Sequence, residues 1–83
     1  MKVQVLYFAQ ARERAGRSAE TLELAEGDRL DAALAAIRRA HPDLDPLWQH
    51  LAVAVDGELA PADAPLRSGA EIALLPPVSG GSR

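Results

Sequence analysis

Val3-Gln4-Val5-Leu6-Tyr7-Phe8 is the stretch that decides the fold, because its β-branched and aromatic residues are typical of a strand. Successive side chains of a strand point to opposite faces of the sheet. One face of this strand is wholly apolar and consists of Val3, Val5 and Tyr7. The other face carries Lys2, Gln4, Leu6 and Phe8. We expect the first face to meet the core and the second to look outward, which places two apolar residues on the outer surface.

Four further segments are predicted to complete the sheet, and they are residues 20–24, 51–55, 58–60 and 70–75. The first alternates polar and apolar residues and should pair as a hairpin with residues 3–8. The apolar run at 51–55 is typical of a central strand, and Asp56-Gly57 predicts the tight turn that follows it. In 70–75, Ile72 and Leu74 take the core face and Leu75 the other face. This last segment can lie beside residues 3–8 at the centre of the sheet.

One amphipathic helix is predicted to cover the sheet, because apolar residues recur at helical spacing at Leu30, Ala33, Leu34, Ile37 and Ala40. Asp28 is the expected N-cap, and Pro42 should end the helix near His41. Residues 9–19 are polar with a turn expected at Gly16-Arg17, and residues 43–46 are expected to form a loop. The element order predicts an α+β domain, in which a mixed sheet of about five strands packs on one main helix.

The composition excludes several classes of protein. The 83-residue chain has no cysteine, which excludes disulfides, thiolate nucleophiles and iron–sulfur ligation. Its net charge is −3 and Lys2 is its single lysine, so we expect no nucleic-acid partner, because phosphate neutralisation needs clustered positive charge. There is no apolar run near the length of a membrane span, and the N-terminus lacks a signal-peptide pattern. We therefore expect a cytoplasmic protein with no membrane partner.

Catalytic side chains do not form a credible group in this sequence. Catalysis needs a nucleophile, an acid or base with a tuned pKa, or a metal. His41 and His50 have no partner at metal-ligand spacing, so we expect no metal site and no bound cofactor. We interpret His41 as a helix-end residue and His50 as a surface residue, and Asp43 and Asp45 as solvated turn residues. The chain is therefore not expected to have an active site of its own.

The C-terminal tail is the remaining reactive element. We divide the chain into a domain at residues 1–75 and a flexible tail at residues 76–83 that carries Gly80-Gly81. Glycine has no side chain, so a chain that ends in a glycine carboxylate can pass through a narrow channel. Activation by a nucleotide would turn it into an acyl-adenylate, which could then accept sulfur or form an amide with a lysine. Both fates need a partner that supplies the catalytic groups.

Three segments together resemble a known family: Val5-Leu6-Tyr7-Phe8-Ala9-Gln10-Ala11-Arg12-Glu13, Pro65-Leu66-Arg67-Ser68-Gly69-Ala70-Glu71 and Leu75-Pro76-Pro77-Val78-Ser79-Gly80-Gly81. They resemble the small subunit of molybdopterin synthase, whose family consists of ubiquitin-like sulfur carriers. The ending Pro-Pro-Val-Ser-Gly-Gly is the most specific part of the resemblance. The resemblance implies a ubiquitin-like β-grasp fold.

The same resemblance implies a function. Gly81 would be adenylated by an E1-like activating enzyme that uses ATP, and then converted to a thiocarboxylate. The tail would insert into the large synthase subunit through Pro76, Pro77, Val78, Ser79 and Gly80. The sulfur would pass to a pyranopterin precursor in molybdenum cofactor biosynthesis. Docking in the family uses apolar residues near the tail, and the matching positions are Phe8, Leu59 and Leu75. The chain would be a non-catalytic carrier in a heterotetramer with a central dimer of large subunits.

Ser82 and Arg83 depart from the family pattern, because members ordinarily end at the second glycine. While Ser82 follows it, Gly81 has no free carboxylate to adenylate. A peptidase removes these residues, or they are a non-native remnant, or this copy is inactive as a sulfur donor. Three other functions stay open: a sulfur carrier for thiamine or cysteine biosynthesis, which fits the Pro-Pro-Val-Ser lead-in less well, a ubiquitin-like protein modifier joined to target lysines, and a plain binding module with an inert tail.

Overall fold

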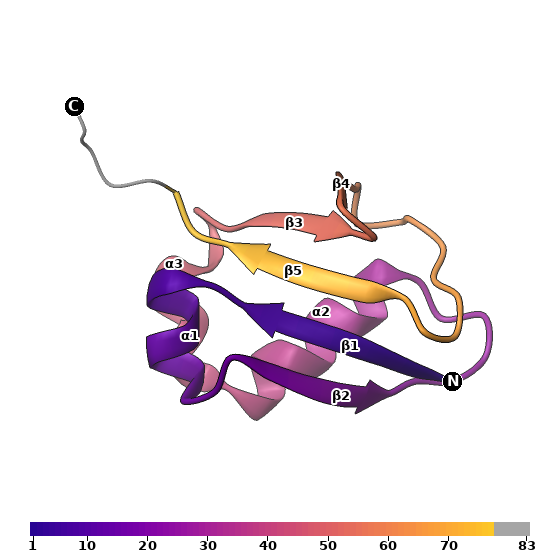
Figure 1. Ribbon diagram of the computed structural model, residues 1–83, viewed down its shortest axis with the longest axis horizontal. Helices are drawn as coiled ribbons and strands as arrows, with labels where there is room; N and C mark the ends of the chain where they lie inside the picture. The colour runs from indigo at the N-terminus through magenta and orange to yellow at the C-terminus, as the bar shows by residue number, and fades with distance from the viewer. Residues whose placement is uncertain (78–83) are drawn as a thin grey trace.

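Five strands form one sheet, and the longest helix lies across one of its faces (Figure 1). The computed structural model describes residues 1–77. The strands are β1 (Lys2–Tyr7), β2 (Ala19–Glu23), β3 (Ala52–Val55), β4 (Glu58–Leu59) and β5 (Glu71–Leu75). The helices are α1 (Ala9–Ala15), α2 (Leu30–Ala40), the 3₁₀ turn η1 (Pro42–Leu44) and α3 (Asp45–Trp48). The expected α+β fold, with a mixed sheet on one main helix, is confirmed.

The sheet has the order β2-β1-β5-β3-β4, so β1 and β5 are the central pair. They run parallel, with Val5 opposite Ile72 and Tyr7 opposite Leu74. The other three pairings are antiparallel, and β1 and β2 form the expected hairpin. Because parallel strands end at the same edge of a sheet, β1 and β5 both finish at the edge where α1 and α3 lie (Figure 1).

The core lies between the sheet and α2. It contains the apolar face of β1, the inner residues of β5 and the inner stripe of α2: Val3, Val5, Tyr7, Ile72, Leu74, Leu30, Ala33 and Ile37. The face assignments made for residues 3–8 and 70–75 are thereby confirmed. Leu34, also expected on the helix stripe, is half-buried and packs at the margin of the core. Within residues 1–77, no helix is long and apolar enough to cross a membrane.

The segment 9–19 contains a helix that the sequence pattern did not predict. Residues 9–15 form α1, which ends at Gly16 in a left-handed conformation with φ 80°. The Gly16 N–H donates to the carbonyl of Arg12, which is a common way to end a helix. Ala11 is the buried residue of α1. A single buried alanine gives no apolar period, so the helix rests on the good helix formers Ala, Gln, Arg and Glu rather than on an amphipathic pattern.

Two further expectations were wrong. The residue at the N-cap of α2 is Arg29, and it makes no side-chain cap hydrogen bond. The Asp28 carboxylate instead accepts from the Ala25 N–H at 3.0 Å, which closes the turn before the helix. Residues 43–46, expected to be a loop, belong to η1 and α3. Pro42 and Pro46 fit there because a proline is tolerated in the first turn of a helix, where its missing N–H is not needed.

Candidate docking surface and tail

The C-terminal tail begins where β5 ends. Pro76 is half-buried beside the end of the strand and Pro77 is exposed. Both lack a backbone donor, so neither can continue the pairing of β5. The predictions made for Val78, Ser79, Gly80, Gly81, Ser82 and Arg83 lie outside the described residues. The part of the site that the structure places is therefore the surface from which the tail leaves.

Phe8 and Leu75 are neighbours at this end of the sheet. Tyr7 is opposite Leu74 in the parallel pairing, and Phe8 continues beyond β1 with an extended backbone at φ −117° and ψ 148°, so Phe8 and Leu75 lie beside each other on the outer face. Phe8 is 44% exposed and Leu75 is half-buried. Directly after Phe8, Ala9 has a φ of 50°, a left-handed conformation that turns the chain from β1 into α1. The outward position expected for both side chains is thus observed.

Leu59 lies on the same outer face but further away. It is on β4, at the edge of the sheet, and it is 74% exposed. Its opposite residue is Ala54 on β3, and Ala54 is in turn opposite Ala73 on β5. The strand β3 therefore separates Leu59 from β5. The three predicted docking residues share one face, but β4, which carries Leu59, does not pair with β1 or β5.

An apolar row that crosses all five strands connects these residues. Directly opposite residues of neighbouring strands share a face, and the row consists of Ala19, Leu6, Ala73, Ala54 and Leu59. A second row at the tail end of the sheet holds Phe8, Leu75 and Ala52. We call these eight residues the outer apolar surface. Its alanines were not predicted from the sequence, because an alanine by itself does not indicate an exposed apolar surface until the strand register places it beside leucines.

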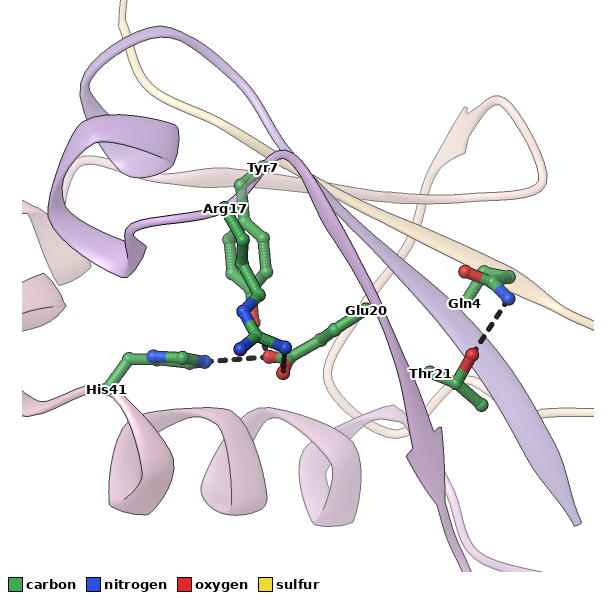
Figure 2. Close-up of polar contacts among 6 residues, drawn as sticks. All are labelled: Gln4, Tyr7, Arg17, Glu20, Thr21 and His41. Atoms are coloured by element: carbon green, nitrogen blue, oxygen red, sulfur yellow. Dashed lines mark hydrogen bonds and ion pairs between the residues drawn. The ribbon is translucent and has the colours of Figure 1, made fainter.

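The rest of the outer face is polar. The next row holds Thr21, Gln4 and Glu71, and Lys2 lies opposite Glu23 beyond it. The Gln4 amide donates to the Thr21 hydroxyl at 3.0 Å (Figure 2). The outer face is therefore divided, with its apolar part near the origin of the tail and its polar part away from it. A divided face of this kind is typical of a protein-interaction surface with a polar border.

A cluster of titratable side chains lies on the inner side of the same end of the sheet. Figure 2 shows Tyr7, Arg17 and His41 converging on the carboxylate of Glu20. His41 Nε2 lies 2.7 Å from Glu20 Oε2, the Tyr7 hydroxyl donates to the same oxygen, and Arg17 lies 3.2 Å from Oε1. The rings of Tyr7 and His41 meet edge to face at 5.5 Å. His41 was predicted only as a helix-end residue, and no local pattern in the sequence indicates this cluster.

The cluster favours an ionised Glu20. Burial by itself raises the pKa of Glu20, but the hydrogen bonds from Tyr7 and His41 and the electrostatic attraction of His41 and Arg17 outweigh it, so the pKa lies below its ordinary value. Burial and the hydrogen bond to Glu20 raise the pKa of Tyr7. Since a carboxylate only accepts, His41 Nε2 must carry a hydrogen. The cluster thus ties β1, β2 and the end of α2 together.

Acid is expected to weaken the interactions that Glu20 makes in this cluster. Because the folded protein lowers the pKa of Glu20, the carboxylate contributes stability that is fully present above the carboxyl pKa of the unfolded chain. That contribution is lost as the pH falls through the lower pKa of the folded state. Between about pH 5 and pH 3, we expect the free energy of unfolding to fall by about 1 kcal/mol more for the natural chain than for Glu20→Gln. Urea unfolding at a series of pH values measures the difference.

Glu13→Gln is the matched control, because Glu13 is exposed on α1. Its unfolding free energy should follow that of the natural chain across the same pH range. If Glu20→Gln and the natural chain lose stability equally on acidification, the charge of Glu20 does not hold the cluster together.

Comparison with known sequences identifies relatives along the whole chain. The sequence profile of the ThiS family matches residues 5–81. The molybdopterin synthase sulfur carrier subunit of Chlamydomonas reinhardtii is 42% identical over an alignment of 83 positions that covers 98% of this chain and 100% of that protein. The subunit of the same name from Mycobacterium tuberculosis is 32% identical over 82 residues, 98% of this chain and 99% of that protein.

Solved structures agree with these sequence relatives. SAMP1 from Haloferax volcanii has a TM-score of 0.90 and 30% identity, with 98% of this chain and 100% of that chain covered. A putative molybdopterin converting factor subunit 1 from Pyrococcus furiosus has a TM-score of 0.86 and 30% identity, with 94% and 99% covered. A complex of subunits 1 and 2 of the molybdopterin-converting factor from Helicobacter pylori contains a chain with a TM-score of 0.72 and 28% identity, with 98% and 100% covered.

These likenesses confirm the ubiquitin-like β-grasp expected from the sequence. They also confirm the resemblance to the sulfur carriers of molybdopterin synthase, because the alignments with relatives of that name cover 98% of this chain at 42% and 32% identity. This chain belongs to the ThiS family.

Proposed function

We propose that this chain is the sulfur-carrier small subunit of a molybdopterin synthase. The observation that carries the proposal is the 42% identity to a subunit of that name along its whole length. The chain's own structure supports it in two ways. An apolar surface lies where the tail begins, and the titratable cluster around Glu20 faces inward rather than toward the tail. The chain therefore acts as a handle for its C-terminus, in the cytoplasm.

The chemistry is assigned to Gly81. A peptidase first hydrolyses the Gly81–Ser82 peptide bond, which gives Gly81 a free carboxylate. In an E1-like activating enzyme, this carboxylate attacks the α-phosphorus of ATP, and pyrophosphate leaves. A sulfur donor then displaces AMP from the acyl-adenylate, which produces the thiocarboxylate. In the large subunit, the thiocarboxylate sulfur forms a bond to a carbon of the pyranopterin precursor and displaces an oxygen group from it. Water then hydrolyses the acyl–sulfur bond, which leaves the sulfur on the pterin and returns Gly81 to a carboxylate for another cycle.

Docking to the large subunit is assigned to Phe8, Leu59 and Leu75. In the Helicobacter pylori structure, subunit 1 of the molybdopterin-converting factor is in complex with subunit 2. The three residues of this chain share the outer face, and two of them adjoin the origin of the tail. A partner that covers them receives Pro76, Pro77 and the residues that follow at the same time. We therefore assign the tail from Pro76 to Gly80 to insertion into this partner.

Reconstitution tests the proposal. The chain ending at Gly81 is prepared as its thiocarboxylate and mixed with the large synthase subunit of the same organism and the pyranopterin precursor. We expect molybdopterin to form in proportion to the carrier, with one sulfur lost from each chain. The carboxylate form of the same chain is the control and should give no product. Sulfur transfer to a thiamine or cysteine precursor, but not to the pyranopterin, would reassign the pathway.

A ubiquitin-like modifier is the second candidate, because SAMP1, a small archaeal modifier protein, matches this fold with a TM-score of 0.90. An activated Gly81 would then form an isopeptide bond with a lysine of another protein. Mass spectrometry of lysates from the native host measures this, since digestion leaves a remnant of the carrier tail on each modified lysine. Such adducts, dependent on the activating enzyme, would support the modifier function beside or in place of sulfur transfer.

A further inference from the structure

The outer apolar surface has its smallest side chains at its centre. Ala73 on β5 lies between Leu6 and Ala54, and Ala52 is opposite Leu75. We call Ala52, Ala54 and Ala73 the alanine floor. Each of these side chains ends at Cβ, whereas a leucine extends further from the backbone by three more carbons. The floor is therefore the low part of the surface, and Leu6, Leu75 and Leu59 form its higher border.

The floor can be reached from outside. Ala52 is exposed and Ala73 is half-buried, whereas Ala54 is buried with 6% of its surface exposed, so the floor is reached at Ala52 and Ala73. The two rows that contain the floor consist of apolar residues among those that the structure describes, and the charged residues of this face lie further along the strands. A continuous apolar surface of this kind is unfavourable in water and is stabilised when a partner covers it.

We propose that the alanine floor receives one large apolar side chain of the large synthase subunit, and that the small size of Ala73 is what admits it. The inference rests on the proposed function. We assign the large subunit as the partner because the floor adjoins two of the residues assigned to docking, with Leu75 on one side and Leu59 on the other. A partner that contacts both leucines lies directly over the floor. Ala73 and Ala52 do not reach up to it, so contact requires a side chain that descends from the partner.

Packing explains why the floor determines specificity. The centre of a stable interface is packed as densely as a protein interior and excludes water, and the largest contributions to affinity come from such central positions. An empty space over the floor would leave the apolar atoms on both sides without contacts. Conversely, a larger side chain at position 73 occupies the space that the partner's side chain needs. Because Ala73 points away from the core, this change leaves the packing against α2 intact.

Binding of Ala73→Leu to the large subunit tests the inference. Isothermal titration calorimetry compares the full chain with the variant, and we expect the dissociation constant to rise at least about tenfold. Ala35→Leu is the matched control, since it makes the same chemical change on an exposed position of α2. Its dissociation constant should stay within about twofold of the natural chain. Circular dichroism and thermal unfolding show whether each variant keeps the fold.

Three outcomes would overturn the inference. If Ala73→Leu binds as tightly as the natural chain while Leu75→Asp binds weakly, the floor is not contacted, and the proposed function stands. If neither variant binds weakly, the docking surface of the proposed function is wrong as well. If the isolated chain is a dimer by sedimentation and Ala73→Leu makes it monomeric, the occupant is a second copy of this chain. Should Ala73→Leu fail to fold, Ala52→Leu at the exposed end of the floor carries the same expectation.

Discussion

The chain that ends at Gly81 is expected to be adenylated by its activating enzyme, whereas the chain that continues into Ser82 is expected to be inert. The reason is the bond at the carbonyl of Gly81. A free carboxylate carries a negative oxygen that can attack phosphorus. In the longer chain the carbonyl of Gly81 belongs to a peptide amide, whose oxygen is a far weaker nucleophile, and the free carboxylate is on Arg83, two residues away from the position that we assign to the reaction. We therefore expect measurable adenylation of the chain that ends at Gly81 and only the background signal with the longer chain.

Exchange of radioactive pyrophosphate into ATP measures this step directly, because each reversible adenylation exchanges one pyrophosphate. The two forms of the chain are compared at equal concentration with the activating enzyme, and intact mass is recorded before and after the reaction. A chain ending at Gly80 is the control for tail length, and it should also give background exchange. If the chain that retains Ser82 and Arg83 supports exchange with its mass unchanged, the assignment of Gly81 as the reactive residue is wrong.

Leu75→Asp is expected to weaken binding to the large subunit by at least about a hundredfold while leaving the fold intact. Leu75 lies beside Phe8 on the outer face, next to the origin of the tail. In the complex an aspartate at this position would be buried without a partner, and the loss of its hydration is unfavourable by several kcal/mol. Phe8→Ala removes apolar area without adding charge, so we expect a smaller loss, about tenfold to thirtyfold.

Thr21→Asp is the matched control for the added charge, since Thr21 lies on the polar part of the same face. Its affinity should be close to that of the natural chain. Calorimetric titration gives the dissociation constants, and thermal unfolding gives the stability of each variant. Marked unfolding of Phe8→Ala or Leu75→Asp would show that these side chains support the core, which would contradict the assignment of strand faces. Equal affinity of all variants would contradict the docking surface.

The strand faces could be predicted from the sequence because a strand has a fixed period of two. Val5 and Tyr7 alternate with Gln4 and Leu6, so one observation fixed the inner and outer faces of β1. The turn at Asp56-Gly57 was equally predictable, since both residues have positive φ, at 52° and 88°, and this pair of residue types adopts such angles readily.

Contacts between distant residues could not be predicted in the same way. Glu20 and His41 are 21 positions apart and meet only because the β1–β2 hairpin and the end of α2 are packed together. The alanine floor depends on the register that places Ala54 between Ala73 and Leu59. Neither arrangement has a local pattern in the chain. The helix α1 was missed for a related reason, because it buries one alanine and thus has no apolar period.

The end of β5 sets a limit on where a partner can carry out its chemistry. Gly81 lies four positions after Pro77, and a fully extended chain advances by at most about 3.6 Å per residue. The carbonyl carbon of Gly81 can therefore lie no further than about 15 Å from the position at which Pro77 leaves the domain. When the outer apolar surface is held against a partner, the position of the domain therefore limits how far from Pro77 the partner can meet Gly81. Every enzyme that activates, loads or unloads this carrier by holding that surface must place its reacting groups within that radius.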